Sequence, residues 1–427
     1  MFIKRIHLMR LLFPLIALLA IASSCRDKNY FDKENYQRIT HGIYPVDTLD
    51  ESHDWNLIRS SVVQVTTNGG LSDVSSVQIL SGNPYSGLVE VLGSKKAGPG
   101  EKVRFTIDFP ITQETLYAAA VTSSGKYYVK EFSVDKHEVQ FADGGIIGNG
   151  DFVAPANQKI TYLFEESFPE PTDFDFNDVV LRISKSAPET NLLCLTVTLA
   201  AAGASKPIAG AIRLRNVDYS QVEEVTIAEE QRMDDDYPMM RTKLRSDFNL
   251  SEGSYGEAVI NLFEDAHWSL GHEKDDIGII KTLKYNTMHY AKEDVSAIVQ
   301  QQTRTYNIRL KEGVDATMLS MSSLDPFIIT PYNGVNFEIH THQFKFSEVL
   351  WSYLGKDKTA YDDHLAWALA IPDPLFRYPI EEMPLGTYRN GEIFGAYGKY
   401  MHSFGEWGRN QYAATDWWQY PSSSMGY

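Results

Sequence analysis

Cysteine is nearly absent from this chain of 427 residues, which contains only Cys25 and Cys194. If Cys25 carries lipid, as its surroundings indicate below, no intramolecular disulfide can form, and the folded part depends on its apolar core. Cys194 lies within the apolar run 192–197, where a lone thiol is typical of a small buried hydrophobic side chain rather than of a nucleophile.

Positive charge is scarce. The chain has 39 Lys and Arg residues against 56 Asp and Glu residues, which gives a formal net charge of −17. Removal of residues 1–24, which carry three positive charges and no negative ones, lowers that charge to −20. Such a surface lacks the basic patch that nucleic acids and anionic lipid headgroups require, so we expect neither as a partner. Divalent cations suit it better.

Catalytic signatures are also missing. No G-x-S-x-G motif supplies a serine nucleophile, and the glycine-rich stretch 143–150 is not followed by the helical pattern that a nucleotide-binding loop needs. Pairs of carboxylates occur throughout so acidic a chain, so they do not indicate a glycosidase. We therefore predict no catalytic residues and a non-enzymatic protein.

The first 25 residues have the pattern of a bacterial lipoprotein signal. Three basic residues precede an apolar stretch, 11–21, that is too short to span a bilayer. Small residues at 22–24 then lead to Cys25. We predict that a signal peptide, 1–24, is removed and that Cys25 is lipidated.

A lipidated Cys25 would anchor the protein permanently, because two or three acyl chains are attached and each buried methylene contributes about 0.8 kcal/mol. Residues 25–50 begin with a polar run after the anchor, and we predict that they tether the folded part to the membrane. We expect an outer-membrane lipoprotein that contacts the membrane through this anchor. The single acidic residue that follows it, Asp27, leaves surface exposure open.

Short alternating strands separated by turn residues run through most of the mature chain and predict an all-β fold. Their close spacing in 51–142 indicates a small β-sandwich of immunoglobulin-like type. A glycine-rich linker, 143–150, separates it from 151–427, where a larger antiparallel β-sandwich of jelly-roll type is expected. Aromatic residues at three- and four-residue spacing in 393–407 predict one amphipathic helix on the surface of this domain.

The most unusual stretch of the mature chain is acidic and lies soon after the linker. Three of its side chains follow the D-x-D-x-N spacing with which calcium loops begin. Its carboxylates, with no lysine or arginine among them, would repel one another unless a cation, water or backbone donors offset their charge. We therefore predict a structural Ca²⁺ site. The predicted ligands are Asp173, Asp175, Asn177 and Asp178, with Glu165 and Glu166 from the preceding turn.

The match to an EF-hand stops after these first positions. Asp178 stands where that loop needs glycine, no bidentate glutamate follows at its twelfth position, and a strand follows instead of a helix. The alternative is a purely structural acidic turn. In that case Asp173 and Asp175 bind backbone N–H groups while Phe174 and Phe176 fill the core.

The same stretch carries a resemblance to a known family. Phe164-Glu165-Glu166, followed by D-F-D-F-N-D-V-V at 173–180, resembles the signature of the LruC domain, a family of bacterial lipoprotein and surface domains. Further blocks follow in the family's order, as far as Tyr420: Gly210–Leu214, Glu338–His340, Trp367–Pro372, Phe376–Glu381, Ala396-Tyr397, Phe404–Trp407 and Asp416–Trp418. Ala366, Gly408 and Trp418 depart from the family pattern. The resemblance implies a surface lipoprotein domain of unassigned biochemistry, with calcium suggested only by the acidic signature.

Two further groups of side chains could bind ligands. His340 and His342 lie on one face of a predicted strand at a spacing compatible with Zn²⁺, but they lack cysteine partners, and ordinary polar positions are the better interpretation. Aromatic side chains near the C-terminus could form a platform on which a sugar stacks, or could pack in the core. The platform candidates are Trp407, Tyr412, Trp417 and Trp418.

These features together predict a lipid-anchored envelope or cell-surface protein. Its Ca²⁺-stabilised β domain would bind a glycan, a matrix polymer or another surface protein through a shallow aromatic face. A structural subunit of a surface appendage is one alternative and requires an unpaired strand or groove for a neighbour's strand. A polysaccharide-directed hydrolase is the other and requires two facing carboxylates in a deep cleft.

Overall fold

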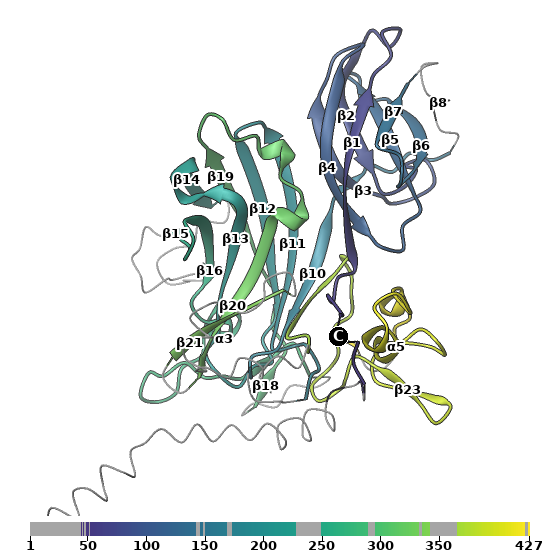
Figure 1. The fold of residues 1–427 in the computed structure, drawn as a ribbon. Helices are drawn as coiled ribbons and strands as arrows, with labels where there is room; N and C mark the ends of the chain where they lie inside the picture. Colours follow the sequence, from purple (N-terminus) through teal and green to yellow (C-terminus); the bar gives the residue numbers. More distant parts are fainter. Residues whose placement is uncertain are drawn as a thin grey trace, which may run out of the picture.

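The computed structural model describes residues 44, 46, 48–50, 52–141, 146–147, 150–168, 173–227, 249–288, 295–332, 335–341, 365–422 and 426–427. Within these residues the chain consists mainly of antiparallel strands arranged as two sandwiches, which confirms the predicted all-β fold (Figure 1). The predicted signal peptide and Cys25 lie outside the described residues. In the described part, no helix is both long and apolar enough to cross a membrane.

The smaller sandwich packs a three-stranded sheet, of order β4-β1-β7, against a six-stranded sheet, of order β8-β6-β5-β2-β3-β9. Its strands are β1 (Ile58–Thr66), β2 (Val74–Leu80), β3 (Glu90–Lys96), β4 (Lys102–Pro110), β5 (Thr115–Thr122), β6 (Tyr127–Ser133), β7 (Glu138–Gln140), β8 (Ile146–Ile147) and β9 (Ala156–Asn157). An immunoglobulin domain places its first, second, fourth and fifth strands in one sheet. Here β1 and β4 are in one sheet and β2 and β5 in the other, so the strand order differs from that of an immunoglobulin domain.

The core between these sheets consists of every second side chain along each strand. Val63 and Val65 from β1 are fully buried against Phe105 and Ile107 from β4, whereas the side chain of Val62 faces outward. Successive side chains of a strand point to opposite faces of the sheet, so one face of each strand becomes core.

The smaller sandwich continues beyond the predicted glycine-rich linker. β8 pairs with β6, and β9 adds to β3 in parallel orientation. The next strand, β10, begins at Lys159 and belongs to the larger sandwich. The chain therefore crosses between the sandwiches at Gln158, whose Nε2 donates a hydrogen bond to the backbone oxygen of Asp108 at 2.8 Å.

The larger sandwich packs a six-stranded sheet, of order β14-β19-β12-β11-β10-β22, against a five-stranded sheet, of order β15-β16-β13-β20-β21. The first contains β10 (Lys159–Phe164), β11 (Val179–Glu189), β12 (Leu192–Ala201), β14 (Val222–Ile227), β19 (Gln302–Leu310) and β22 (Ala368–Ile371). The second contains β13 (Ala209–Asp218), β15 (Leu250–Glu252), β16 (Glu257–Phe263), β20 (Leu324–Tyr332) and β21 (Val335–His340). Buried side chains of both sheets, among them Leu195, Val197, Ile212 and Ile260, belong to one continuous core.

Short elements connect and cover these sheets. They are α3 (Ala266–Gly271), α5 (Phe404–Arg409), η1 (Tyr219–Gln221), η3 (Ala316–Met318), η4 (Met321–Ser323), η6 (Trp417–Gln419), and the strand pairs β17 (Lys284–Tyr285) with β18 (Ser296–Ala297) and β23 (Thr387–Arg389) with β24 (Glu392–Phe394).

The C-terminal region does not form the predicted helix over 393–407. Residues 392–394 are a strand, and only α5 is helical. Gly395 lies between them with a φ of 133°, and a Cβ atom there would come within 2.4 Å of the Cα atom of Gly386. This close approach requires glycine and ends any helix, so the aromatic spacing was read with the wrong period.

The first described residues pack against this C-terminal region, as Figure 1 shows beside α5. Tyr44 is buried with its ring centroid 5.9 Å from that of Phe404, and Trp55 stacks on Phe404 at 5.5 Å. Trp55 also meets Trp407 edge-on at 5.3 Å. The end of the predicted tether 25–50 is therefore part of the core of the larger domain rather than a free spacer.

Candidate metal centre

The acidic stretch connects two neighbouring strands. β10 ends at Phe164 and β11 begins at Val179, and these two residues are paired in the antiparallel sheet. The two ends of the connection therefore lie side by side, and Glu166 lies next to Asp178. The backbone N–H of Glu166 donates to Oδ2 of Asp178 at 2.6 Å. Glu170, another acidic residue of this connection, lies outside the described residues.

Two phenylalanines of the acidic loop point into the core, on the side of the loop opposite to the acidic side chains. Phe174 and Phe176 have φ angles of 50° and 57°, a left-handed conformation that costs bulky residues about 1–3 kcal/mol each. Both rings are fully buried, and Phe174 meets the rings of Tyr44 and Trp367 at 4.7 Å and 5.1 Å. The predicted role of these rings as core residues is thus found, and packing of the N-terminal segment supports the strained loop.

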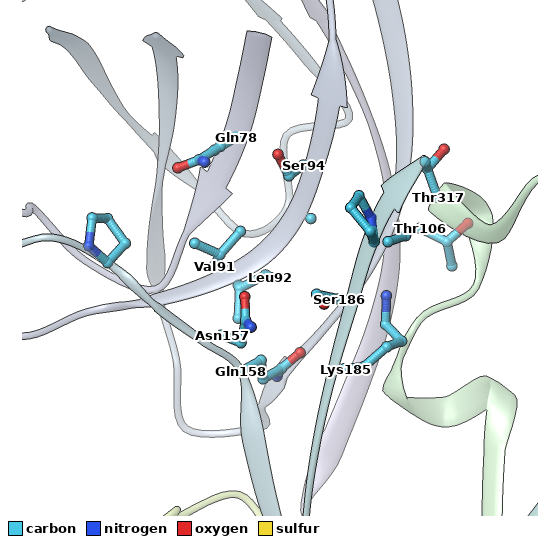
Figure 2. Close-up of a pocket in the computed structure, with 14 residues that line it drawn as sticks. Gln78, Val91, Leu92, Ser94, Thr106, Asn157, Gln158, Lys185, Ser186 and Thr317 are labelled. Atoms are coloured by element: carbon cyan, nitrogen blue, oxygen red, sulfur yellow. The ribbon is translucent and has the colours of Figure 1, made fainter. Parts of the chain in front are cut away.

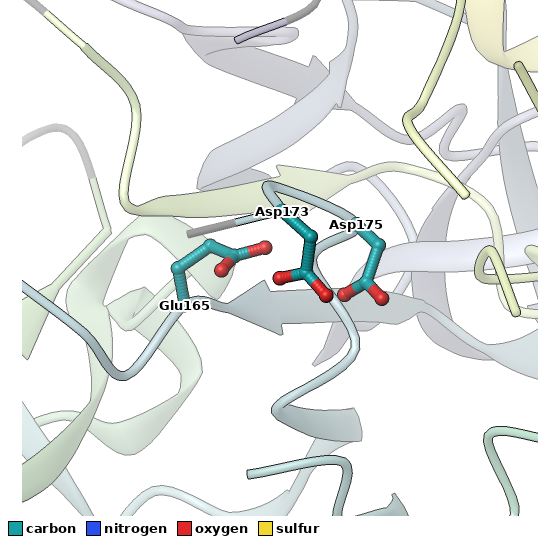
Figure 3. Close-up of side chains that lie close together, drawn as sticks. All are labelled: Glu165, Asp173 and Asp175. Atoms are coloured by element: carbon teal, nitrogen blue, oxygen red, sulfur yellow. The ribbon is translucent and has the colours of Figure 1, made fainter. Parts of the chain in front are cut away.

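Three carboxylates converge on the other side of the loop. Glu165, Asp173 and Asp175 each offer one oxygen, and these oxygens lie within 4.8 Å of one another (Figure 3). Ca²⁺ binds oxygen at about 2.3–2.6 Å, so ligands on opposite sides of the ion are about 4.6–5.2 Å apart. The spacing therefore fits three oxygens around a single Ca²⁺.

Backbone N–H groups already donate hydrogen bonds to two of these three carboxylates. Asp175 accepts hydrogen bonds from the N–H of Asn177 at 3.2 Å and of Glu382 at 2.8 Å, and Glu165 accepts one from the N–H of Phe176. These bonds are what the acidic-turn alternative requires. A carboxylate oxygen has two lone pairs, however, so each retains a site for a cation. Asp173 has no hydrogen bond or ion pair to another described residue.

The other predicted ligands have different surroundings. Both oxygens of Glu166 accept hydrogen bonds, from the N–H and hydroxyl of Ser205 at 2.8 and 2.7 Å and from the N–H of Lys206 at 3.2 Å. Glu166 therefore fixes the loop after β12. The Nδ2 of Asn177 donates to the backbone oxygen of Pro379 at 3.2 Å, while its Oδ1 is buried without a hydrogen-bond partner among the described residues.

Gly203 allows this placement of Asn177. A Cβ atom at position 203 would come within 2.2 Å of the Asn177 Oδ1 atom. The N–H of Gly203 also donates to the backbone oxygens of Asn177 and Asp178, at 3.1 and 3.0 Å. The segment that follows β12 therefore packs directly against the acidic loop and is hydrogen-bonded to it.

Burial makes the charged form of these carboxyls unfavourable. Burial and, after it, the neighbouring carboxylates raise the pKa of Glu165 and of Asp175 well above their usual values. Burial and the charge of Glu166 raise the pKa of Asp178 to about 8. Without a cation the charged forms of these groups are therefore disfavoured, and a divalent cation at their centre would reverse the shift.

An open pocket of about 400 Å³ leads to the group. Asp173 lines it together with Asp178, Lys284 and Glu381. Lys284 forms an ion pair with Glu381, which also accepts a hydrogen bond from the Thr287 hydroxyl at 3.1 Å. Asp173 belongs to both the carboxylate group and the pocket, so an ion has a path from solvent. The contributions of Lys284, Glu381 and Glu382 were not predicted, because these residues come from distant segments.

The first of the two histidines is engaged by carboxylates in the described part. Nδ1 of His340 lies 2.7 Å from Oδ2 of Asp325, and Nε2 lies 3.1 Å from Oε2 of Glu338. Both ring nitrogens are therefore engaged by carboxylates. Burial lowers the pKa of His340, but the hydrogen bonds that its ring donates to Asp325 and Glu338 outweigh this effect and raise the pKa. His342 lies outside the described residues.

Two of the predicted platform residues are core residues instead. Trp407 and Trp417 are fully buried, with ring centroids 6.1 Å apart, so neither can stack on a sugar. Trp418 is partly buried and donates from Nε1 to the Thr415 oxygen at 3.1 Å. Tyr412 remains 85% exposed. Sequence reasoning missed a different pair, in which the partly exposed Tyr388 on β23 meets the exposed Tyr400 edge-on at 5.0 Å.

Cys194 is half-buried in β12. Its Sγ donates a weak hydrogen bond to Oδ1 of Asn307 at 3.3 Å. Burial raises the pKa of the thiol, which keeps it protonated and unreactive.

Comparisons with known proteins place this fold. The crystal structure of a Bacteroides ovatus protein, described as a candidate lipoprotein, is similar over 83% of this chain and 99% of its own, with a TM-score of 0.51 and 17% identity. At that identity the likeness concerns the fold alone. No curated protein matches the chain. A family model described as a domain of unknown function, DUF4842, matches residues 192–418, just over half of the chain, and begins after the acidic loop. The chain therefore belongs to the DUF4842 family.

Proposed function

We propose that this protein is a non-catalytic, lipid-anchored envelope protein whose larger sandwich is stabilised by Ca²⁺ and binds a glycan or a surface protein. The observation that carries the proposal is the convergence of Glu165, Asp173 and Asp175 within 4.8 Å in a largely buried loop. Buried charges that repel one another are costly, and a bound cation offsets that cost.

The strained backbone of the loop supports the same proposal. Residues in rare conformations persist where the surroundings determine them, and they are concentrated at binding sites. Here Phe174 and Phe176 are held by aromatic neighbours from both ends of the described chain, including Tyr44 and Phe404. A bound ion would therefore connect the central sheet with the terminal segments.

The anchor and the location rest on the sequence pattern before Cys25. A signal peptide that ends in small residues and a cysteine is typical of exported lipoproteins. The LruC-like blocks, which include the acidic signature outside the matched family range, favour an outer-membrane or cell-surface location.

A binding role is supported by exposed aromatic side chains at the C-terminal end. Phe394, Tyr400 and Tyr412 are 61%, 65% and 85% exposed. Aromatic rings with one polar end suit both sugar stacking and protein contacts.

The calcium proposal is tested by thermal unfolding of the full chain in Ca²⁺ and in EGTA. At calcium concentrations 100-fold above the dissociation constant, binding stabilises the folded state by about 2.7 kcal/mol, so Tm should rise. Asp173→Asn should respond little to Ca²⁺, and it should melt no lower than wild type in EGTA because a repelling charge is gone. Asp73→Asn, at an exposed position outside the loop, is the matched control and should respond like wild type. Equal wild-type curves with and without Ca²⁺ would remove the metal from this account.

A further inference from the structure

A second cavity, of about 240 Å³, lies where the two sandwiches meet (Figure 2). Strands β3 and β9 of the smaller sandwich contribute Ser94 and Asn157, and β11 of the larger sandwich contributes Lys185. At roughly 30 Å³ per water molecule the cavity has room for about eight waters, or for a ligand the size of one sugar ring.

The walls of this cavity are fixed by contacts outside its lining. Nζ of Lys95 on β3 lies 3.4 Å from Oδ2 of Asp315, just before η3. The carboxylate of Asp108 on β4 accepts hydrogen bonds from the N–H and hydroxyl of Ser322, at 2.6 and 2.9 Å, and from the hydroxyl of Ser60 at 2.5 Å. The cavity is therefore largely pre-formed, as ligand sites usually are.

Lys185 is a cation without a counter-ion. Among the described residues its Nζ forms neither a hydrogen bond nor an ion pair, and Figure 2 shows the side chain along the cavity wall, below Thr106 and Thr317. Burial lowers the pKa of Lys185 to about 8, and the charge of Asp108 opposes this shift only in part. The Lys185 ammonium has lost part of its hydration and gained no hydrogen-bond partner among the described residues, so an anion in the cavity would be stabilising.

Neutral polar groups complete the lining. Oε1 of Gln78 is buried without a hydrogen-bond partner among the described residues, and Ser94 lies beside Gln78 on the neighbouring strand, β3. Asn157 also lines the cavity. The pairing of β11 with β12 is interrupted between Ser186 and Glu189, and such irregularities re-aim side chains beside binding sites. Amides and hydroxyls arranged around one cation match a ligand that carries several hydroxyls and one negative charge.

Four charged side chains near this interface are already engaged. Lys95 and Asp315 pair with each other, and the carboxylate of Asp108 has its three donors. Glu90, at the start of β3, accepts a hydrogen bond from the N–H of Lys159 at 3.0 Å, and burial raises its pKa to about 7. Lys185 is thus the charged member of the lining and carries the charge selectivity of the cavity.

We propose that this cavity binds one carboxylated sugar residue, with the carboxylate on the Lys185 ammonium and the sugar hydroxyls on the amides and hydroxyls of the walls. This inference rests on the binding role proposed above and names its ligand class. The cavity is separate from the proposed calcium centre, which lies in the connection between β10 and β11.

The test is a calorimetric titration of the full chain with D-glucuronate, with D-glucose and acetate as reference ligands. Glucuronate should bind, whereas glucose lacks the charge and acetate lacks the hydroxyls. Lys185→Met should weaken glucuronate binding about tenfold or more, because hydrogen bonds to charged groups are strong. Lys126→Met, which removes an exposed charge from a hairpin turn of the smaller sandwich, should leave binding unchanged.

Protonation provides a second readout. Because a bound carboxylate raises the pKa of Lys185, binding at pH 8.5 should take up protons in wild type and not in Lys185→Met, measured in buffers of different ionisation enthalpy. The proposal is overturned if wild type does not bind glucuronate, if Lys185→Met binds it equally, or if glucose or acetate binds as tightly. Failure here with calcium-dependent melting intact leaves the calcium centre standing, and the converse result leaves this site standing.

Discussion

Single residues in the acidic loop are governed by burial. Glu165 and Asp175 are almost completely inaccessible, and their pKa values are raised well above the usual range for carboxyls. The folded protein without a cation therefore binds protons that the unfolded chain releases above about pH 4. This difference links the stability of the protein both to pH and to calcium.

The pH dependence has a definite sign. Asp178 has a folded-state pKa of about 8, above its unfolded value, so its protonation stabilises the fold at low pH, and this contribution is lost as pH rises toward 8. In EGTA, Tm should therefore fall between pH 5 and pH 8, and saturating Ca²⁺ should abolish the fall. Asp178→Asn should reduce the slope in EGTA. A wild-type Tm that is constant or rises over this range in EGTA would contradict the pKa shifts.

Secondary-structure elements were predictable where one physical pattern dominated. Alternation in stretches such as 62–67 and 192–199 correctly indicates strands, because the pleat directs every second side chain into a core. The turn after Phe164 was predictable as an acidic loop but not as a backbone with two left-handed phenylalanines. That conformation depends on Tyr44 and Phe404, which are far away in the sequence.

The C-terminal elements show where sequence reasoning failed. The aromatic spacing in 393–407 predicts a helix, yet the close approach at Gly395 produces a hairpin and a short helix. Likewise the burial of Trp407 depends on Trp55 from the other end of the chain, which no local pattern reveals. The cavity around Lys185 was missed for the same reason, since its walls come from both sandwiches.

Burial of the C-terminal aromatics is tested by a matched pair of substitutions. Trp407→Ala removes a fully buried ring and should cost about 3–5 kcal/mol of unfolding free energy. Tyr412→Ala removes a ring that is 85% exposed and should change stability by less than about 0.5 kcal/mol. Urea unfolding measures both. A small loss for Trp407→Ala would mean that α5 and the first described residues do not pack as the structure shows.

The whole molecule combines a predicted anchor with two sandwiches that contact each other through hydrogen bonds and an ion pair. Contacts such as that between Asp108 and Ser322 fix the smaller sandwich against the larger one. The end of the predicted tether is part of the larger domain, since Tyr44 is buried there. The free part of the tether is therefore shorter than residues 25–50, and the folded part would be held closer to the membrane than a tether of that full length predicts.

Anchoring is tested by fractionation of cells that express the full chain. Cys25→Ser removes the predicted lipid attachment and should move the protein from the membrane fraction to the soluble fraction. Cys194→Ser changes the other cysteine, which lies in β12, and should leave the protein in the membrane fraction. Retention of Cys25→Ser in membranes would show that the anchor has been misassigned.

The central claim is that a calcium ion lies among Glu165, Asp173 and Asp175. Diffraction from crystals grown with Ca²⁺ tests it most directly, through the anomalous signal of the bound metal. We predict one peak within about 2.3–2.6 Å of an oxygen from each of these three side chains. A map without such a peak, in which backbone amides alone contact the three carboxyls, would contradict the account.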